Sequence, residues 1–129
     1  MRLGPTILLA LSASLLSPAG NGEGAVKTLD CEIPRTCDSA GVCADDSGRI
    51  DFRLEPIELE AGGVGRYTIR YGDAVAEADA RSDIGPFAWT VGQARHALVI
   101  SSDTQWIWHR LEPDSTAAIV HFMRCDFQQ

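Results

Sequence analysis

The sequence predicts an all-β protein: a small antiparallel meander of about eight short strands, closed into a barrel or folded as a sandwich, and stapled by disulfide bonds. Three observations favour this class. Short segments alternate apolar and polar residues, as half-buried strands do. Turn signals rich in glycine, proline and aspartate separate these segments, and four cysteines are available for covalent links. A barrel is favoured over a sandwich because closure removes exposed strand edges.

The chain begins with the pattern of an export leader. Arg2 precedes an apolar run over residues 7–16, and Ser17-Pro18-Ala19 ends that run with small residues. This is the layout of a secretory signal peptide, and the apolar run is too short to span a bilayer. We therefore expect a signal peptide over 1–19 and a single β domain over 20–129, with a flexible start at 20–25. The protein would then be periplasmic or secreted.

Composition restricts the partners. Removing the leader takes away one arginine and no acid, so the formal charge becomes (11 − 1) − 18 = −8. Nucleic acid and anionic lipid surfaces repel such a domain, and no second apolar stretch predicts stable membrane insertion. Lys27 is the only lysine, and alanine and glycine are frequent, which is typical of a GC-rich bacterial genome. We expect a protein or glycan ligand in the cell envelope.

The four cysteines predict a disulfide framework. An even count in a small exported domain allows three pairings, and we favour Cys37–Cys43 and Cys31–Cys125. The short pair brackets a turn-forming segment, whereas the long pair would tie the first strand to the last. In the chain-entropy view the long loop is worth about 4–5 kcal/mol and the short loop about 2–2.5 kcal/mol. Zinc-ligand spacing is absent, so we expect no metal and no cofactor.

The strands follow from alternation and turns. A first strand over 27–32 leads into a cysteine loop that runs to Gly48. Residues 49–55 alternate cleanly, and the pattern resumes after Pro56. Alanines over 74–80 would favour helix, but the tight Gly72-Asp73 turn makes that segment the hairpin partner of 65–71. The remaining strands are expected over 87–91, 97–101, 104–111 and 117–127.

The segment Trp106-Ile107-Trp108-His109-Arg110 is the most unusual stretch. In a strand, Trp106, Trp108 and Arg110 share one face and Ile107, His109 and Leu111 share the other. One interpretation places both indoles in the core. The other makes them, with Trp89, an exposed platform for a sugar ring or an apolar partner, with Arg110 at its rim.

Histidines provide the remaining candidate chemistry. His109 and His121 lie on neighbouring predicted strands and could face one another as a metal-binding or titrating pair. Ser101-Ser102 could be drawn as a nucleophile with His96 or His109 as base. The sequence contains no G-x-S-x-G or H-E-x-x-H motif, and two disulfides would leave no free thiol. We therefore predict no catalytic residues.

Three segments carry a family resemblance. Gly65-Arg66-Tyr67, the run from Phe87 to Gly92 and the closing Cys125 resemble the order found in bacterial periplasmic inhibitors of c-type lysozyme. The resemblance covers about a third of the mature chain and implies a small barrel with a bridge between its first and last parts. Gly62-Gly63 stands where that family has a motif serine, and the insertion over 68–86 breaks its spacing. No inhibitory residue is transferred.

The sequence thus supports three functional hypotheses. The first is a non-catalytic exported binding module. The second is an inhibitor of a cell-wall-degrading enzyme such as lysozyme, because acidic loops would attract a basic enzyme. The third is a small hydrolase using His96 or His109.

Overall fold

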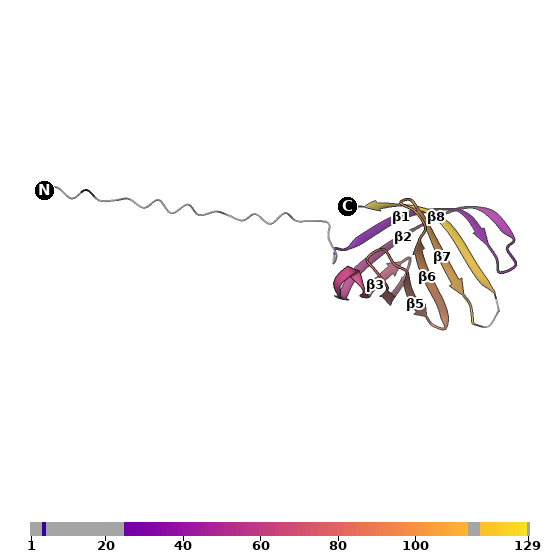
Figure 1. The fold of residues 1–129 in the computed structure, drawn as a ribbon. Coiled ribbons are helices and arrows are strands. Elements are labelled where there is room, and N and C mark those ends of the chain that lie inside the picture. Colours follow the sequence, from indigo (N-terminus) through magenta and orange to yellow (C-terminus); the bar gives the residue numbers. More distant parts are fainter. Residues whose placement is uncertain (1–3, 5–24, 114–116, 129) are drawn as a thin grey trace.

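A computed structural model describes Gly4, residues 25–113 and residues 117–128 of the chain. Eight antiparallel strands form a closed barrel in which each strand pairs with the next and β8 pairs with β1 (Figure 1). The predicted all-β class is confirmed, and closure selects the barrel over the sandwich. The expected leader and its cleavage after Ala19 lie outside the described residues. The strands are β1 Lys27–Cys37, β2 Cys43–Leu59, β3 Gly65–Tyr71, β4 Ala74–Ala80, β5 Phe87–Val91, β6 Ala94–Ile100, β7 Gln105–Leu111 and β8 Ala118–Gln128, with a 3-10 turn, η1, at Ala61–Gly63.

The barrel has two distinct ends. The turns β1–β2, β3–β4 and β5–β6, the end of β7 and the start of β8 lie at one end, which we call the hairpin end. The start of β1, the end of β8, η1 and the connections β4–β5 and β6–β7 lie at the other end, which we call the terminal end. This division fixes where each candidate residue lies along the barrel axis.

The first hairpin is longer than the sequence predicts. β1 continues past the predicted end at residue 32 to Cys37, and β2 begins at Cys43 instead of residue 49. Cys37 faces Cys43 directly across the ladder, and their disulfide closes the hairpin tip with a Cα–Cα distance of 4.0 Å. The predicted cysteine loop is therefore wrong in extent, because the disulfide holds the two arms in register almost to the turn.

The second disulfide links the two strands that close the barrel. Cys31 faces Cys125 across the β1–β8 ladder, with a Cα–Cα distance of 4.1 Å. Both predicted pairings are confirmed, and no described cysteine is free. Two disulfides indicate an oxidising compartment. Within the described chain, no helix combines the length and apolar character that crossing a bilayer requires.

The alanine-rich β4 shows how neighbours override propensity. β3, β4 and β5 have the predicted bounds, and the inward side chains of β4 are all alanine. Ala78 lies opposite Tyr67, and Ala80 lies between Gly65 and Phe87 in the ladders. Small side chains here leave room for the edge-to-face contact of Tyr67 and Phe87, whose centroids are 5.2 Å apart. The Gly72-Asp73 turn and the neighbouring strands therefore make this segment a strand, although its alanines favour helix.

Inward-facing side chains fill the barrel. Its lower layers, toward the terminal end, are apolar, while the layer nearest the hairpin end carries histidines and indoles. The apolar core consists of Leu29, Cys31, Ile33, Phe52, Leu54, Tyr67, Ile69, Ala78, Ala80, Phe87, Trp89, Leu98, Trp106, Trp108, Met123 and Cys125.

Candidate functional site

Four rings line the inside of the hairpin end on consecutive strands. Trp89, His96, Trp108 and His121 come from β5, β6, β7 and β8, and we call them the ring stack. Trp89 and His96 are nearly parallel, with centroids 5.1 Å apart and planes 6° apart. The centroid distances are 6.0 Å from His96 to Trp108 and 4.9 Å from Trp108 to His121. Tyr71 continues the stack, since its hydroxyl accepts the indole N–H of Trp89 at 3.0 Å.

The hydrogen bonds assign a tautomer to each buried histidine. Trp108 donates its Nε1–H to His96 Nδ1 at 3.2 Å, so the proton of neutral His96 lies on Nε2. Thr36 Oγ1 donates to Asp46 Oδ2 at 2.8 Å, and its distance to His121 Nδ1 is also 2.8 Å. Because the single Thr36 proton goes to the carboxylate, His121 Nδ1–H donates to Thr36. His121 Nε2 is then a lone-pair acceptor, buried without a hydrogen-bond partner in the described structure.

Charge and burial set the protonation of this layer. Burial lowers the pKa of His96 and of His121, and the positive charge of Arg110 lowers both further. The hydrogen bond from Thr36 and that from the Gly48 amide lower the pKa of Asp46. At neutral pH the two imidazoles are therefore neutral and Asp46 is charged. The layer holds both histidines as hydrogen-bonding rings and not as cations.

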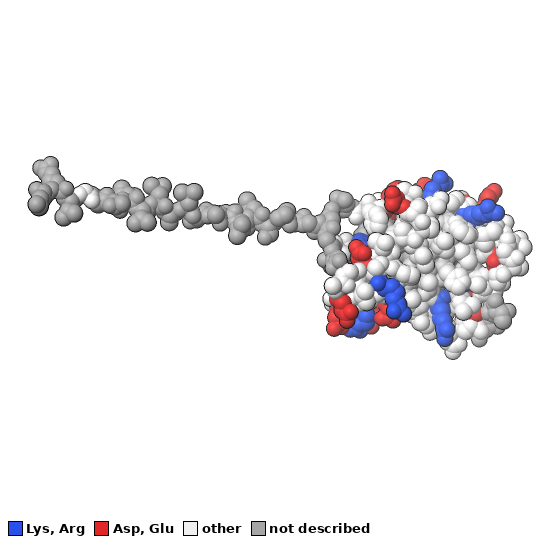
Figure 2. Space-filling view, viewed as in Figure 1, with Lys and Arg blue, Asp and Glu red and all other residues white. Residues whose placement is uncertain are grey.

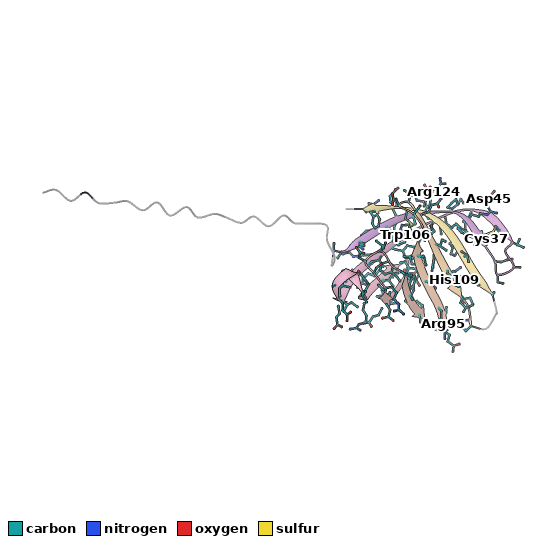
Figure 3. The ribbon with its side chains drawn as sticks, viewed as in Figure 1. Cys37, Asp45, Arg95, Trp106, His109 and Arg124 are labelled. Carbon is teal, nitrogen blue, oxygen red and sulfur yellow. A yellow bond between two sulfur atoms is a disulfide. The ribbon has the colours of Figure 1, made fainter. Side chains whose placement is uncertain are left out.

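The indoles of the proposed platform lie in the barrel interior. Trp89, Trp106 and Trp108 are 4%, 1% and 6% exposed, which for Trp106 and Trp108 agrees with the core interpretation of the sequence. Arg110 shares their face, and its guanidinium lies 5.2 Å from the Trp108 ring centroid. The structure brings Trp89, Trp108 and Arg110 together near the hairpin end through His96, which stacks on both indoles. Trp106, labelled in Figure 3, lies toward the terminal end.

The pairing of His109 with His121, which the sequence left open, does not form. His109 faces Val120 in the β7–β8 ladder, whereas Trp108 faces His121. Directly opposed residues share a face, so His109 points outward and His121 inward. Ser101 and Ser102, considered above as nucleophiles, lie in the β6–β7 turn. Their hydroxyls hydrogen-bond to the backbone of Gln105 and not to His96 or His109. Sequence reasoning missed the Asp46–Thr36–His121 chain, since its three members come from three strands.

The outer face of β6, β7 and β8 is apolar. Across these strands His109 lies between Ala97 and Val120 in one row, and Ile107 lies between Val99 and Phe122 in the next. Phe122 is 41% exposed. No aspartate or glutamate occurs in β6, in β7, or in β8 before Asp126. We call this surface the apolar face, and its members are Ala97, Val99, Ile107, His109, Leu111, Ala118, Val120 and Phe122.

The apolar face contrasts with the rest of the barrel wall. Figure 2 shows an almost uncharged area over β6–β8, between Arg95 and Arg124, which Figure 3 labels in the same view. On the outer side of β1–β4, by contrast, Arg49, Arg53, Arg66 and Arg70 each bind one or two carboxylates. A hollow of about 740 Å³ lies over part of this network. Its arginines already have anionic partners, which favours a structural role for that wall.

A small pocket adjoins the apolar face. Its volume is about 240 Å³, and Pro34, Trp106, Phe122 and Met123 supply its apolar lining, with Ser101, Gln105 and Arg124 at its polar side. The pocket lies where the β1–β8 register shifts between Glu32 and Arg35. The buried Nε1–H of Trp106 has no hydrogen-bond partner among the residues described. The pocket could hold one large side chain and we call it the anchor pocket.

A groove opens at the seam between β4 and β5. Its volume is about 480 Å³, and two members of the ring stack, Trp89 and His96, form part of its lining. Charged side chains from β4 and β6 flank it. The full lining is Glu77, Asp79, Ala88, Trp89, Thr90, Arg95 and His96.

The described residues contain no group of three or more histidine, cysteine or acidic side chains that could hold a metal ion.

Comparison of the chain with protein-family models, with curated proteins and with solved structures finds no significant match.

Proposed function

We propose that this protein is an exported, non-catalytic binding module, periplasmic or secreted, that docks a protein partner on the apolar face. The single observation that carries this proposal is the contrast between a face without carboxylates and the acidic remainder of the molecule. Outward positions of a solvated barrel are normally polar, so a contiguous apolar surface of this kind is typical of an interaction site.

The rim of the apolar face favours a particular partner. Arg35 faces Phe122 from β1, Arg95 faces Leu111 from β6, and Arg124 follows on β8. None of the three forms an ion pair within the described residues, unlike the arginines of the β1–β4 wall. A partner with an apolar centre and an acidic rim would therefore match this surface. A second copy would bring like charges together at the rim, which disfavours self-association.

The anchor pocket gives the interface a centre. Binding energy at protein interfaces concentrates in a few large side chains that enter well-packed pockets. The anchor pocket shares Phe122 with the apolar face and offers the unpaired N–H of Trp106 nearby. We expect one aromatic or long aliphatic side chain of the partner to occupy it.

A matched pair of substitutions tests the proposal. Ile107→Lys places a charge on the apolar face, and Ile57→Lys places the same charge on β2, where the isoleucine is 46% exposed. Photo-crosslinking from position 109 in the exporting cell should trap a partner, which is then purified. Its affinity should fall with Ile107→Lys and stay unchanged with Ile57→Lys. Equal effects of the two substitutions, or a crosslinked homodimer confirmed by sedimentation, would overturn the proposal.

Inhibition of a cell-wall-degrading enzyme is a second candidate. It is supported by the net charge and by the carboxylates of Glu77 and Asp79 in the β4–β5 groove, which would attract a basic enzyme. A basic lysozyme, titrated at low and at high salt, tests this candidate directly. Salt-sensitive binding with loss of lytic activity supports it, and no binding at low salt rejects it.

Hydrolysis has the weakest support. Within the described chain no hydroxyl bonds to His96 or His109, and the chain Asp46–Thr36–His121 has its hydroxyl between carboxylate and imidazole. In a nucleophilic triad the imidazole lies between the other two groups. In the described structure the Thr36 hydroxyl donates to Asp46 and holds the His121 ring in place, and no imidazole accepts the hydroxyl proton.

A further inference from the structure

The β4–β5 seam is the weakest ladder of the barrel. Each other neighbouring pair of strands has five or more facing residues, whereas β4 and β5 have only Asp79↔Ala88 and Ala80↔Phe87. Over Ala74–Ala78 and over Trp89–Val91 the two strands have no ladder with each other. Alternate backbone N–H and C=O groups of these edges are therefore left for another partner.

Side chains seal the barrel behind this seam. The Trp89 indole donates to the Tyr71 hydroxyl, and the two ring centroids are 5.6 Å apart. Trp89 in turn stacks on His96. The gap between the strands is therefore a groove about 480 Å³ in volume and not an entrance to the core. A segment of extended chain could lie in it without disturbing the apolar layers.

The floor of the groove presents an unused donor. His96 is 8% exposed, and its Nδ1 accepts the Trp108 indole proton, so Nε2 carries a hydrogen. No described residue accepts that hydrogen. A backbone carbonyl of an inserted segment would satisfy it. The Nε2 of His96 is not among the buried polar atoms left without a partner, so it is open to the groove and available to a peptide-like acceptor.

The wall of the groove on β4 is acidic. Glu77 and Asp79 are exposed and line the groove, and Asp79 forms no ion pair in the described structure. Glu77 shares Arg66 with Glu58, at a distance of 3.3 Å from the guanidinium. Arg95, from β6, is the basic residue on the opposite side. Basic side chains of a bound segment would therefore lie toward β4.

We propose that the β4–β5 seam is a second docking site, which takes an extended segment of a partner protein bearing lysine or arginine. The segment adds as a short strand along β4, the longer of the two free edges, and its basic side chains meet Glu77 and Asp79. Its main chain supplies hydrogen bonds, and its alternate side chains supply selectivity. This site shares Arg95 with the rim of the apolar face and includes none of the residues of that face itself.

Peptide probes test this inference on the full chain produced by export. The first probe is a hexapeptide of alternating arginine and valine, followed through the tryptophan emission of the protein, to which Trp89 contributes, and through amide exchange of Ala74–Ala78. It should bind, protect those amides and weaken with salt. The same peptide N-methylated at alternate residues should lose binding, since it cannot form a ladder. A glutamate–valine peptide should not bind.

A pair of isosteric variants identifies the carboxylate. Asp79→Asn should weaken binding of the arginine peptide about two- to fivefold, the range of a partly exposed ion pair. Asp103→Asn, in the exposed β6–β7 turn at the terminal end, should leave it unchanged. Equal binding of the N-methylated or glutamate peptide, equal effects of the two variants, or no binding of the arginine peptide would each overturn the inference. Ile107→Lys should not alter peptide binding, so the two docking proposals fail separately.

Discussion

Trp108 donates its indole N–H to His96 Nδ1 at 3.2 Å, so an indole fixes which imidazole nitrogen carries the proton. A protonated His96 would carry a hydrogen on Nδ1 facing that same N–H. The pair therefore requires a neutral ring. His121 is neutral for a related reason, because it is buried close to the charge of Arg110.

Stability should fall in mild acid. The pKa of His96 and of His121 is lowered by folding from a reference near 6.5. Below that pH the unfolded chain binds protons that the folded chain does not, so acid favours unfolding. The free energy of unfolding should be highest above about pH 6.5 and should decrease as the pH falls toward the lowered values. Urea titrations at several pH values measure this slope.

A comparison of two histidine variants tests whether the buried imidazoles cause this pH dependence. His121→Gln should reduce the slope below pH 6.5 and leave the part that His96 causes, whereas His109→Gln, on the outer face, should leave the slope as it is. An identical slope in His121→Gln and in the parent chain would contradict the role of this buried ring.

Removing the Thr36 hydroxyl should destabilise the hairpin end. Thr36→Val leaves the buried Nδ1–H of His121 without an acceptor, which should cost about 1–3 kcal/mol. The pKa of Asp46 should rise at the same time, because its largest stabilising contact is the Thr36 hydroxyl. Carboxyl resonances followed by NMR report the second effect. Thr36→Ser keeps the hydroxyl and should preserve both properties.

The two disulfides should differ in their effect on stability. Replacing Cys31 and Cys125 by serine opens a loop with a sequence separation of 94, against 6 for Cys37 and Cys43. The expected losses are about 4–5 and about 2–2.5 kcal/mol if unfolded-state entropy dominates. Denaturant unfolding of the two double variants gives the comparison. A larger loss from the hairpin-tip pair would show that native-state contacts, and not chain entropy, decide the values.

One glycine at the start of β3 should tolerate no side chain. Gly65 has φ +151°, and an added Cβ would collide with the carbonyl oxygen of Glu58 on β2. Gly65→Ala should therefore destabilise the barrel by about 1–3 kcal/mol through overpacking, beyond its backbone strain. Gly72→Ala, at positive φ but in open space, separates the strain from the collision. The melting temperature of Gly65→Ala should be well below that of Gly72→Ala.

Local pattern was sufficient for much of the fold. The turn at Gly72-Asp73 and the alternation before it predicted β3 and β4 to their ends, and the cysteine spacing predicted both disulfides. The length of β1 and β2 was not predictable from their own residues. Asp45, Asp46, Ser47 and Gly48 have low strand propensity, and their place in β2 depends on pairing with β1 and on the Cys37–Cys43 bond.

The candidate surfaces were harder to predict, for two different reasons. The apolar face does leave a signal, since β6, β7 and β8 lack the apolar–polar alternation seen in β2 and β3. From the sequence, an exposed surface is proposed at Trp106 and Trp108, which point inward, and not at Ile107 and Val120, which point outward. The β4–β5 groove leaves none, because it depends on where two strands diverge in space.

The Cys31–Cys125 bond also decides how the barrel responds to tension. It lies four residues after the start of β1 and three before the end of β8, on neighbouring strands. A force that draws Lys27 away from Gln128 is therefore carried by a covalent bond after a few residues have peeled off. The remaining seven ladders are shielded from the load, so a protein attached at either end could pull hard on this barrel without unzipping it.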